Sequence, residues 1–143
     1  MHHTLSYKSY LKSPFLSIKH NSYFEVYDTL FSKYIGTEII FVEVGILDGG
    51  SLFMWRDFFG KKARIIGIDL NPNAKKWEQH GFEIFIGSQS DESFLNDFME
   101  KVGPIDILLD DGGHTFEQQI ITTECLISNI KDGGMLVVED THT

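Results

Sequence analysis

Acidic side chains stand at the ends of several apolar runs in this sequence. Six of them, drawn from four separate runs, are Glu43, Asp69, Asp110, Asp111, Glu139 and Asp140. If the runs are parallel β-strands, their carboxyl ends meet at the edge of the sheet where such sheets bind ligands. Each residue alone could be a helix cap or a solvated loop carboxylate. Together they favour a shared site, because like charges on one rim cost free energy unless something cationic lies among them.

A glycine-rich turn follows the first of these runs. Residues 39–44 indicate a buried strand, Gly45 and Gly49-Gly50 come next, and a helical pattern begins at Ser51. Gly45 would allow a tight turn, and the glycine pair would let a ligand approach the main chain. Backbone N–H groups and a helix N-terminus would then face a small polar ligand. An ordinary strand-to-helix loop would give the same glycine pattern without a ligand.

Asp69 lies about twenty residues beyond the glycines, where a carboxylate can accept hydrogen bonds from a ribose diol. Nicotinamide dinucleotides are also bound through a carboxylate at the ribose, so only the glycine spacing can distinguish a dinucleotide from another nucleoside ligand. A G-x-G-x-x-G fingerprint that starts at Gly45 needs glycine at position 47, where this chain has Leu47. The spacing therefore favours a nucleoside ligand such as S-adenosylmethionine over a pyrophosphate.

Strand and helix patterns alternate along the chain. A helix is predicted over 22–35, and strands are predicted at 39–44, 64–70, 82–86, 105–109 and 135–138, with a helical segment between each pair. Because the strands are continuous apolar runs, we expect a parallel sheet with helices on both faces. Residues 1–21 show no clear period and form an N-terminal segment, so one domain is expected over 22–143.

Two apolar stripes are expected to pack against this sheet. The first comprises Tyr23, Tyr27, Leu30 and Tyr34; the second comprises Phe116, Ile120, Thr123, Ile127 and Ile130. Both follow helical spacing; the first, an aromatic stripe, is typical of a packing face rather than a ligand platform, and the second traces the helix after the fourth strand. Ser90 is the expected cap of the helix that precedes the fourth strand.

Composition narrows the class of protein. The chain has 143 residues, 42% of them hydrophobic, and a net charge of −9, which argues against a nucleic-acid partner. No apolar run approaches the length of a membrane span, and the N-terminus lacks the apolar core of a signal peptide. The single cysteine excludes an internal disulfide and suits a reducing compartment. A cytoplasmic location is therefore expected.

Several short motifs occur in order and together resemble one family. They are Glu43-Val44-Gly45, Gly49-Gly50-Ser51, Gly67-Ile68-Asp69, Gly87-Ser88-Gln89-Ser90-Asp91, Asp110-Asp111-Gly112-Gly113-His114 and Val138-Glu139-Asp140-Thr141-His142-Thr143. Over roughly residues 21–143 the chain resembles class I S-adenosylmethionine-dependent methyltransferases of the macrolide-sugar type. These include the mycinamicin and tylosin sugar O-methyltransferases and related cephalosporin-hydroxylase-like proteins. The resemblance implies a Rossmann-like, doubly wound α/β fold with strand order 3-2-1-4-5.

The resemblance also implies roles for individual residues. Asp111, Glu139 and Asp140 would hold Mg²⁺ or another hard divalent cation, for which carboxylates are suitable ligands, and His114 would be the general base. The residues expected to bind S-adenosylmethionine are Gly45 and Gly49 at its amino-acid moiety, Asp69 at its ribose, Gln89 near its adenine, and Glu43, Ser51, Ser88 and Asp110 around them. The implied reaction is methylation of a hydroxyl on a sugar or another small molecule.

Two departures from the family pattern leave alternatives open. Gly87-Ser88-Gln89 stands where the family usually has Gly-Asp-Gln, so one acidic contact near the adenine is missing. The family also continues beyond His142-Thr143 with a helix and two more strands. We therefore expect either a fragment, or a homo-oligomer in which another copy covers the bare edge of the fifth strand. The alternatives to an enzyme are a non-catalytic cofactor-binding or assembly fragment and, less favoured, a nicotinamide-dinucleotide-binding protein.

Overall fold

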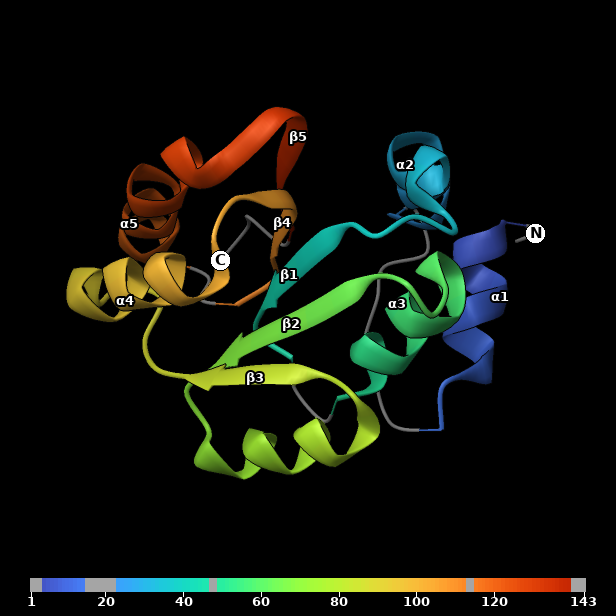
Figure 1. The fold of residues 1–143 in the computed structure, drawn as a ribbon, viewed down its shortest axis with the longest axis horizontal. Helices are drawn as coiled ribbons and strands as arrows, with labels where there is room; N and C mark the ends of the chain where they lie inside the picture. Colours follow the sequence, from blue (N-terminus) through green and yellow to red (C-terminus); the bar gives the residue numbers. More distant parts are fainter. Residues whose placement is uncertain (1–3, 15–22, 47–48, 113–114, 140–143) are drawn as a thin grey trace.

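The centre of the fold is a five-stranded parallel sheet with the order β3-β2-β1-β4-β5 (Figure 1), which confirms the predicted topology. The computed structural model describes residues 4–14, 23–46, 49–112 and 115–139. Its strands are β1 (Ile40–Val44), β2 (Arg64–Asp69), β3 (Glu83–Ile86), β4 (Ile105–Asp110) and β5 (Ile130–Val138). The order reverses between β1 and β4, and in open parallel sheets ligands bind at such a switch point.

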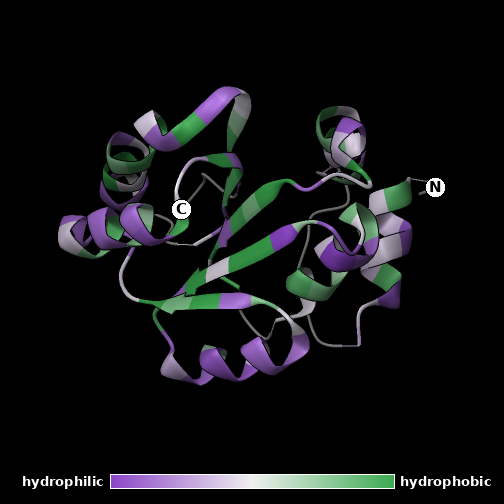
Figure 2. Ribbon diagram, viewed as in Figure 1, coloured by the Kyte–Doolittle hydropathy of each residue, from purple (hydrophilic) through white to green (hydrophobic). Residues whose placement is uncertain are grey.

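Helices cover both faces of this sheet (Figure 1). On one face lie α2 (Tyr23–Phe31), α3 (Gly50–Phe59) and the 3₁₀ helix η2 (Pro72–His80); on the other lie α4 (Glu92–Val102) and α5 (Phe116–Leu126). Two short 3₁₀ turns, η1 (Ser32–Tyr34) and η3 (Ile127–Asn129), follow α2 and α5. Figure 2 shows hydrophobic residues along the strands and hydrophilic ones along η2. No helix in the described ranges is long and apolar enough to cross a membrane.

The face that α2 turns to the sheet is aromatic. Phe24, Tyr27 and Phe31 are at most 1% exposed, whereas Tyr23 and Leu30 are only partly buried. The Tyr27 ring lies edge-on to Trp55 of α3, with 4.8 Å between the ring centroids. The predicted packing role is confirmed, but the centre of the buried face is shifted by one residue from the predicted stripe.

Sequence periodicity does not indicate the first helix, α1 (Leu5–Lys12), because its buried positions are small polar residues, Ser6 and Ser9. The Asp28 carboxylate on α2 accepts hydrogen bonds from the first two backbone N–H groups of this helix, at 2.8 and 3.0 Å. The Ser9 hydroxyl donates to the Asp57 carboxylate on α3 at 2.6 Å. These polar contacts act together with the rings of Tyr7 and Tyr10, which lie 5.1 and 5.3 Å from the Phe24 ring of α2 between centroids.

The helix α5 is shorter than predicted, since it ends at Leu126 and Ile130 already belongs to β5. Of the residues that trace the predicted helix, Ile120 and Ile127 are 52% and 50% exposed. The buried positions of α5 include Gln119, Thr122 and Leu126. The cap of α4 also differs, since Asp91 rather than Ser90 accepts the hydrogen bond from the first turn.

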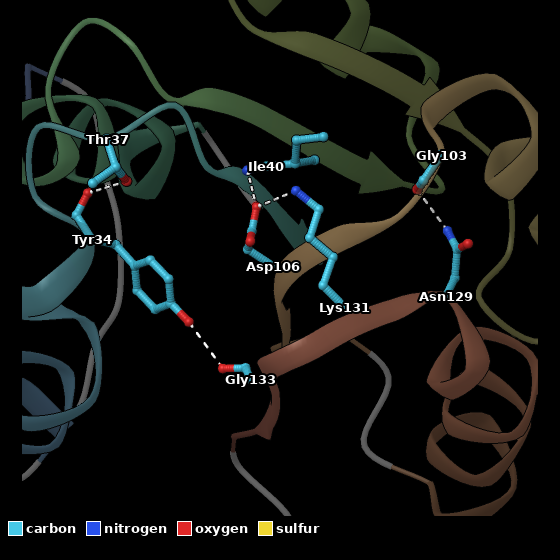
Figure 3. Close-up of polar contacts among 8 residues, drawn as sticks. All are labelled: Tyr34, Thr37, Ile40, Gly103, Asp106, Asn129, Lys131 and Gly133. Atoms are coloured by element: carbon cyan, nitrogen blue, oxygen red, sulfur yellow. Dashed lines mark hydrogen bonds and ion pairs between the residues drawn. The ribbon is translucent and has the colours of Figure 1, made fainter.

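Polar contacts near the amino ends of the strands hold β5 against the rest of the sheet (Figure 3). Asp106 of β4 accepts hydrogen bonds from the Ile40 backbone N–H at 2.8 Å and from the Lys131 ammonium at 3.3 Å. Two further contacts are the Tyr34 hydroxyl to the Gly133 carbonyl, at 3.2 Å, and the Asn129 amide to the Gly103 carbonyl, at 2.7 Å. The strand therefore begins at Ile130, earlier than the apolar run at 135–138 predicts.

We expect Asp106→Ala to lower the free energy of unfolding by about 1–3 kcal/mol, because it removes the acceptor of a part-buried backbone N–H. Urea denaturation measures the change. Asp97→Ala is the matched control: Asp97 pairs with Lys101 on the surface of α4 and its side chain is 58% exposed, so its loss should cost no more than about 0.5 kcal/mol. Equal midpoints for the two variants would contradict a role of Asp106 in holding the sheet together.

Candidate functional site

The carboxyl edge of the sheet brings the predicted site residues together. The register pairs Val44 with Ile68 and Asp110, Asp69 with Ile86, and Asp110 with Val138, so the ends of all five strands lie along one edge. The backbone ladder continues one residue further, through the N–H groups of Gly45, Gly87, Asp111 and Glu139, which bond to neighbouring strands at 2.8–3.0 Å. These bonds therefore fix the backbone of the first loop residue after β1, β3, β4 and β5.

The glycines of the turn after β1 lie close to two other segments of the chain, the loop after β4 and the helix η2. Gly45 has φ +83°, and a Cβ there would lie 2.5 Å from the Gly112 Cα and 2.6 Å from the Asp111 carbonyl oxygen. At Gly49, with φ +81°, a Cβ would lie 2.4 Å from the Trp77 indole. The sequence predicts that the pair Gly49-Gly50 leaves space for a ligand to approach the main chain. In the structure Trp77 occupies that space, and it was not predicted as a site residue.

Asp69 at the end of β2 is held beside the same turn. Its Oδ2 accepts a hydrogen bond from the Ile46 backbone N–H at 3.0 Å, and its Oδ1 accepts one from the Asn71 N–H at 2.9 Å. The side chain is half-buried. A carboxylate has about four acceptor positions, so these two bonds orient Asp69 and still allow it to accept from a ribose diol.

Gln89 and Asp110 form a buried network with Thr122 of α5. The Gln89 amide nitrogen lies 3.1 and 3.2 Å from the two Asp110 oxygens and 2.9 Å from the Thr122 hydroxyl oxygen. All three side chains are at most 6% exposed. Both predicted cofactor residues are therefore held by the protein's own contacts, while the hydroxyl of Ser88 lies 2.9 Å from that of Ser90. Thr122 was missed, because a threonine within a helical pattern gives no signal of a polar partner.

Glu43 and Ser51 bond to each other beneath the glycine turn. The Ser51 hydroxyl donates to the Glu43 carboxylate at 2.5 Å, and the two residues are 0% and 5% exposed. This bond ties β1 to the first turn of α3. The structure thus gives Glu43 and Ser51 a structural partner, and their contact with a cofactor stays a prediction.

The hydroxyl of Tyr27 contacts a carboxylate at the carboxyl edge of the sheet. It donates a hydrogen bond to Glu139 Oε1, from α2 across to the end of β5. Burial, the charge of Glu139 and that hydrogen bond raise the pKa of Tyr27 far above its ordinary value, and the charges of Glu43 and Asp111 act in the same direction. The phenol is therefore a neutral donor. Sequence analysis placed Tyr27 in a packing face only, although a tyrosine between Phe24 and Phe31 was a signal that this position uses a hydroxyl.

The predicted metal ligands are brought together only in part. Asp111 and Glu139 start adjacent loops, joined to β1 and β4 through their backbone N–H groups. Asp140 and His114 lie outside the described residues, and within the described ranges no group of three His, Cys, Asp or Glu side chains is arranged to hold a metal ion. The donors that are described are carboxylates, and their chemistry fits a hard divalent cation.

A parallel sheet of this order, with a glycine turn and an anchored carboxylate at its carboxyl edge, is a doubly wound α/β domain, a class that binds ligands at this edge. The sequence model of a family described as a methyltransferase domain matches residues 42–141. The chain belongs to this family.

Two curated relatives agree with this membership. Demethylmacrocin O-methyltransferase of Streptomyces fradiae is 33% identical over 82% of this chain and 31% of its own length. The 8-demethyl-8-alpha-L-rhamnosyl tetracenomycin-C 2'-O-methyltransferase of Streptomyces olivaceus is 29% identical over 90% of this chain and 37% of its own. The chain thus spans about a third of the length of these relatives.

A solved structure has the same fold. MycE methyltransferase of the mycinamycin biosynthetic pathway, in complex with Mg, SAH and mycinamycin VI, superposes with a TM-score of 0.80 at 29% identity. The match covers 95% of this chain and 36% of the MycE chain. The Rossmann-like fold expected from the sequence is therefore confirmed.

Proposed function

We propose that this chain is the cofactor-binding part of an S-adenosylmethionine-dependent O-methyltransferase that uses a divalent cation and acts on a sugar hydroxyl of a small molecule. The observation that carries the proposal is the arrangement at the carboxyl edge: an anchored Asp69 beside the glycine turn, and Asp111 and Glu139 at the ends of the neighbouring strands β4 and β5. The relatives support it, because they are named as O-methyltransferases and one name includes a rhamnosyl group.

The cofactor is assigned to the half of the edge formed by β1, β2 and β3. Asp69 would accept hydrogen bonds from the ribose hydroxyls, and the turn from Gly45 to Gly49 would lie at the amino-acid moiety. Ser88 and Gln89 would lie near the adenine. The complex of MycE with SAH and Mg supports both the cofactor and the ion.

The reacting groups are assigned to the half formed by β4 and β5. The acceptor oxygen attacks the methyl carbon, the carbon–sulfur bond breaks with its electron pair going to sulfur, and the hydroxyl proton passes to His114. Asp111, Glu139 and Asp140 would hold the cation through oxygen ligands. When bound, the ion acts as a Lewis acid that makes the acceptor hydroxyl more acidic. Alignment of the two reactants supplies much of the remaining acceleration.

Calorimetry with S-adenosylhomocysteine and with NAD⁺ tests the cofactor assignment. We expect S-adenosylhomocysteine to bind and NAD⁺ to remain silent. Asp69→Asn should weaken S-adenosylhomocysteine about tenfold or more, because a charge-assisted hydrogen bond contributes about 1.5–3 kcal/mol. Asp97→Asn, on the exposed surface of α4, is the control and should bind normally.

Two outcomes would favour the alternatives. Tight NAD⁺ binding without S-adenosylhomocysteine binding would indicate an oxidoreductase-type domain. Binding of S-adenosylhomocysteine with no methyl transfer by the complete protein to any of a panel of glycosides would favour a non-catalytic cofactor-binding or assembly role. The same panel identifies the acceptor.

A further inference from the structure

Tyr27 combines a buried ring with a polar contact that packing does not require. Its ring stacks on Phe31 at 5.8 Å and meets Trp55 edge-on at 4.8 Å, both measured between centroids. A phenylalanine would fill the same space, as Phe24 and Phe31 do one turn away on the same buried face. The hydroxyl is therefore the part of Tyr27 that needs a separate explanation.

That hydroxyl contacts a residue at the far end of the fold. Its partner, Glu139, is 112 residues away in sequence and 4% exposed. The Glu139 backbone is already fixed, since its N–H donates to the Asp110 carbonyl at 2.9 Å. The strand end thus fixes the position of the Glu139 backbone, and the Tyr27 hydroxyl bonds one oxygen of its carboxylate.

The bond is compatible with a cation at the same carboxylate. An ionised carboxylate is an acceptor only, so the phenol must be the donor, and the carboxylate oxygens can accept this bond and coordinate an ion together. Ligating carboxylates are commonly oriented by hydrogen bonds from residues that do not touch the ion. The Tyr27 hydroxyl on α2 would orient the Glu139 carboxylate in this way before the ion binds.

We propose that Tyr27 is a positioning residue for the divalent cation, and that its hydroxyl orients the Glu139 carboxylate for binding. This inference rests on the proposed function, specifically on the assignment of Glu139 as a ligand. It gives α2 a role in the site: the helix carries one side chain that belongs to both the aromatic core and the cation-binding edge.

A titration with Mn²⁺, in the absence of cofactor and acceptor, tests the proposal independently of activity. Electron paramagnetic resonance of the free ion measures how much Mn²⁺ the protein binds. Tyr27→Phe should weaken Mn²⁺ about 10- to 100-fold, the usual effect of losing a residue that orients a ligand. Tyr34→Phe is the control, because its hydroxyl bonds the Gly133 carbonyl at an exposed position. Mn²⁺ affinity in that variant should be unchanged.

A double-mutant comparison separates positioning from general damage. In a Glu139→Gln background, Tyr27→Phe should change Mn²⁺ affinity less than twofold, because the carboxylate that it orients is gone. An equal loss in both backgrounds, or wild-type affinity in a folded Tyr27→Phe protein, would overturn the role of Tyr27 and leave the proposed function standing. A wild-type protein that binds no Mn²⁺ would remove the metal assignment and this inference together.

The unmutated ring supplies a second measurement if Tyr27→Phe does not fold. Saturating Mg²⁺ should produce a tyrosine ultraviolet difference spectrum in the wild type and in Tyr34→Phe, since the ion and the Tyr27 hydroxyl share one carboxylate. Glu139→Gln should abolish that spectrum. A protein that binds Mg²⁺ with no tyrosine difference spectrum would contradict the proposal.

Discussion

Replacing His114 with alanine in the complete protein is expected to lower turnover by about 10²- to 10⁴-fold, because it removes the proposed acceptor of the hydroxyl proton. The affinities for S-adenosylhomocysteine and for Mg²⁺ should stay nearly unchanged, since neither depends on proton transfer. Single-turnover methyl transfer, together with calorimetry, measures the two effects separately. A parallel loss of cation affinity would show that His114 is a ligand rather than a base.

The carboxylates should respond differently from the histidine. Asp111→Asn or Asp140→Asn is expected to remove both activity and its dependence on divalent ions, because each substitution replaces a proposed charged oxygen ligand of the cation. Full activity of the wild type in excess EDTA, under conditions that strip bound ions, would show that this carboxylate cluster is not a catalytic metal site.

Gly45→Ala is expected to reduce the free energy of unfolding by about 2–5 kcal/mol. Two costs combine: a left-handed backbone costs an L-residue about 1–2 kcal/mol, and overpacking against fixed atoms costs about 1–3 kcal/mol more. The new Cβ would lie 2.5 Å from the Gly112 Cα, which is backbone and cannot rotate away. Chemical denaturation measures the loss, and S-adenosylhomocysteine affinity should fall with it.

Gly36→Ala separates these two costs. Gly36 has φ +79°, close to that of Gly45, but a Cβ there would meet nothing within 4 Å. Only the backbone cost should appear, at about 1–2 kcal/mol. If both variants lose the same stability, the close contact between the β1 and β4 loops does not contribute as the structure indicates.

Much of the site could be predicted from sequence because its backbone placement is local in origin. Each carboxylate follows an apolar run directly, and parallel strands bring such positions to one edge. Asp69, Asp111 and Glu139 therefore lie where the sequence analysis expected them. What each side chain contacts was not predictable in the same way. Gln89 was assigned to an adenine, yet its amide bonds Asp110 and a threonine of α5.

The sequence alone determined the α/β class and the succession of strands and helices, because apolar periodicity reports which face of a segment is buried. Its short motifs carried the family resemblance. Only the tertiary structure decided which distant groups meet. The contact of Tyr27 with Glu139 joins α2 to the end of β5, and the contact of Gly49 with Trp77 joins the first turn to η2. Such contacts depend on how the elements cross after they pack. The first helix, α1, shows the same limit, since its buried Ser6 and Ser9 give no apolar period and its bonds to Asp28 form only in the folded chain.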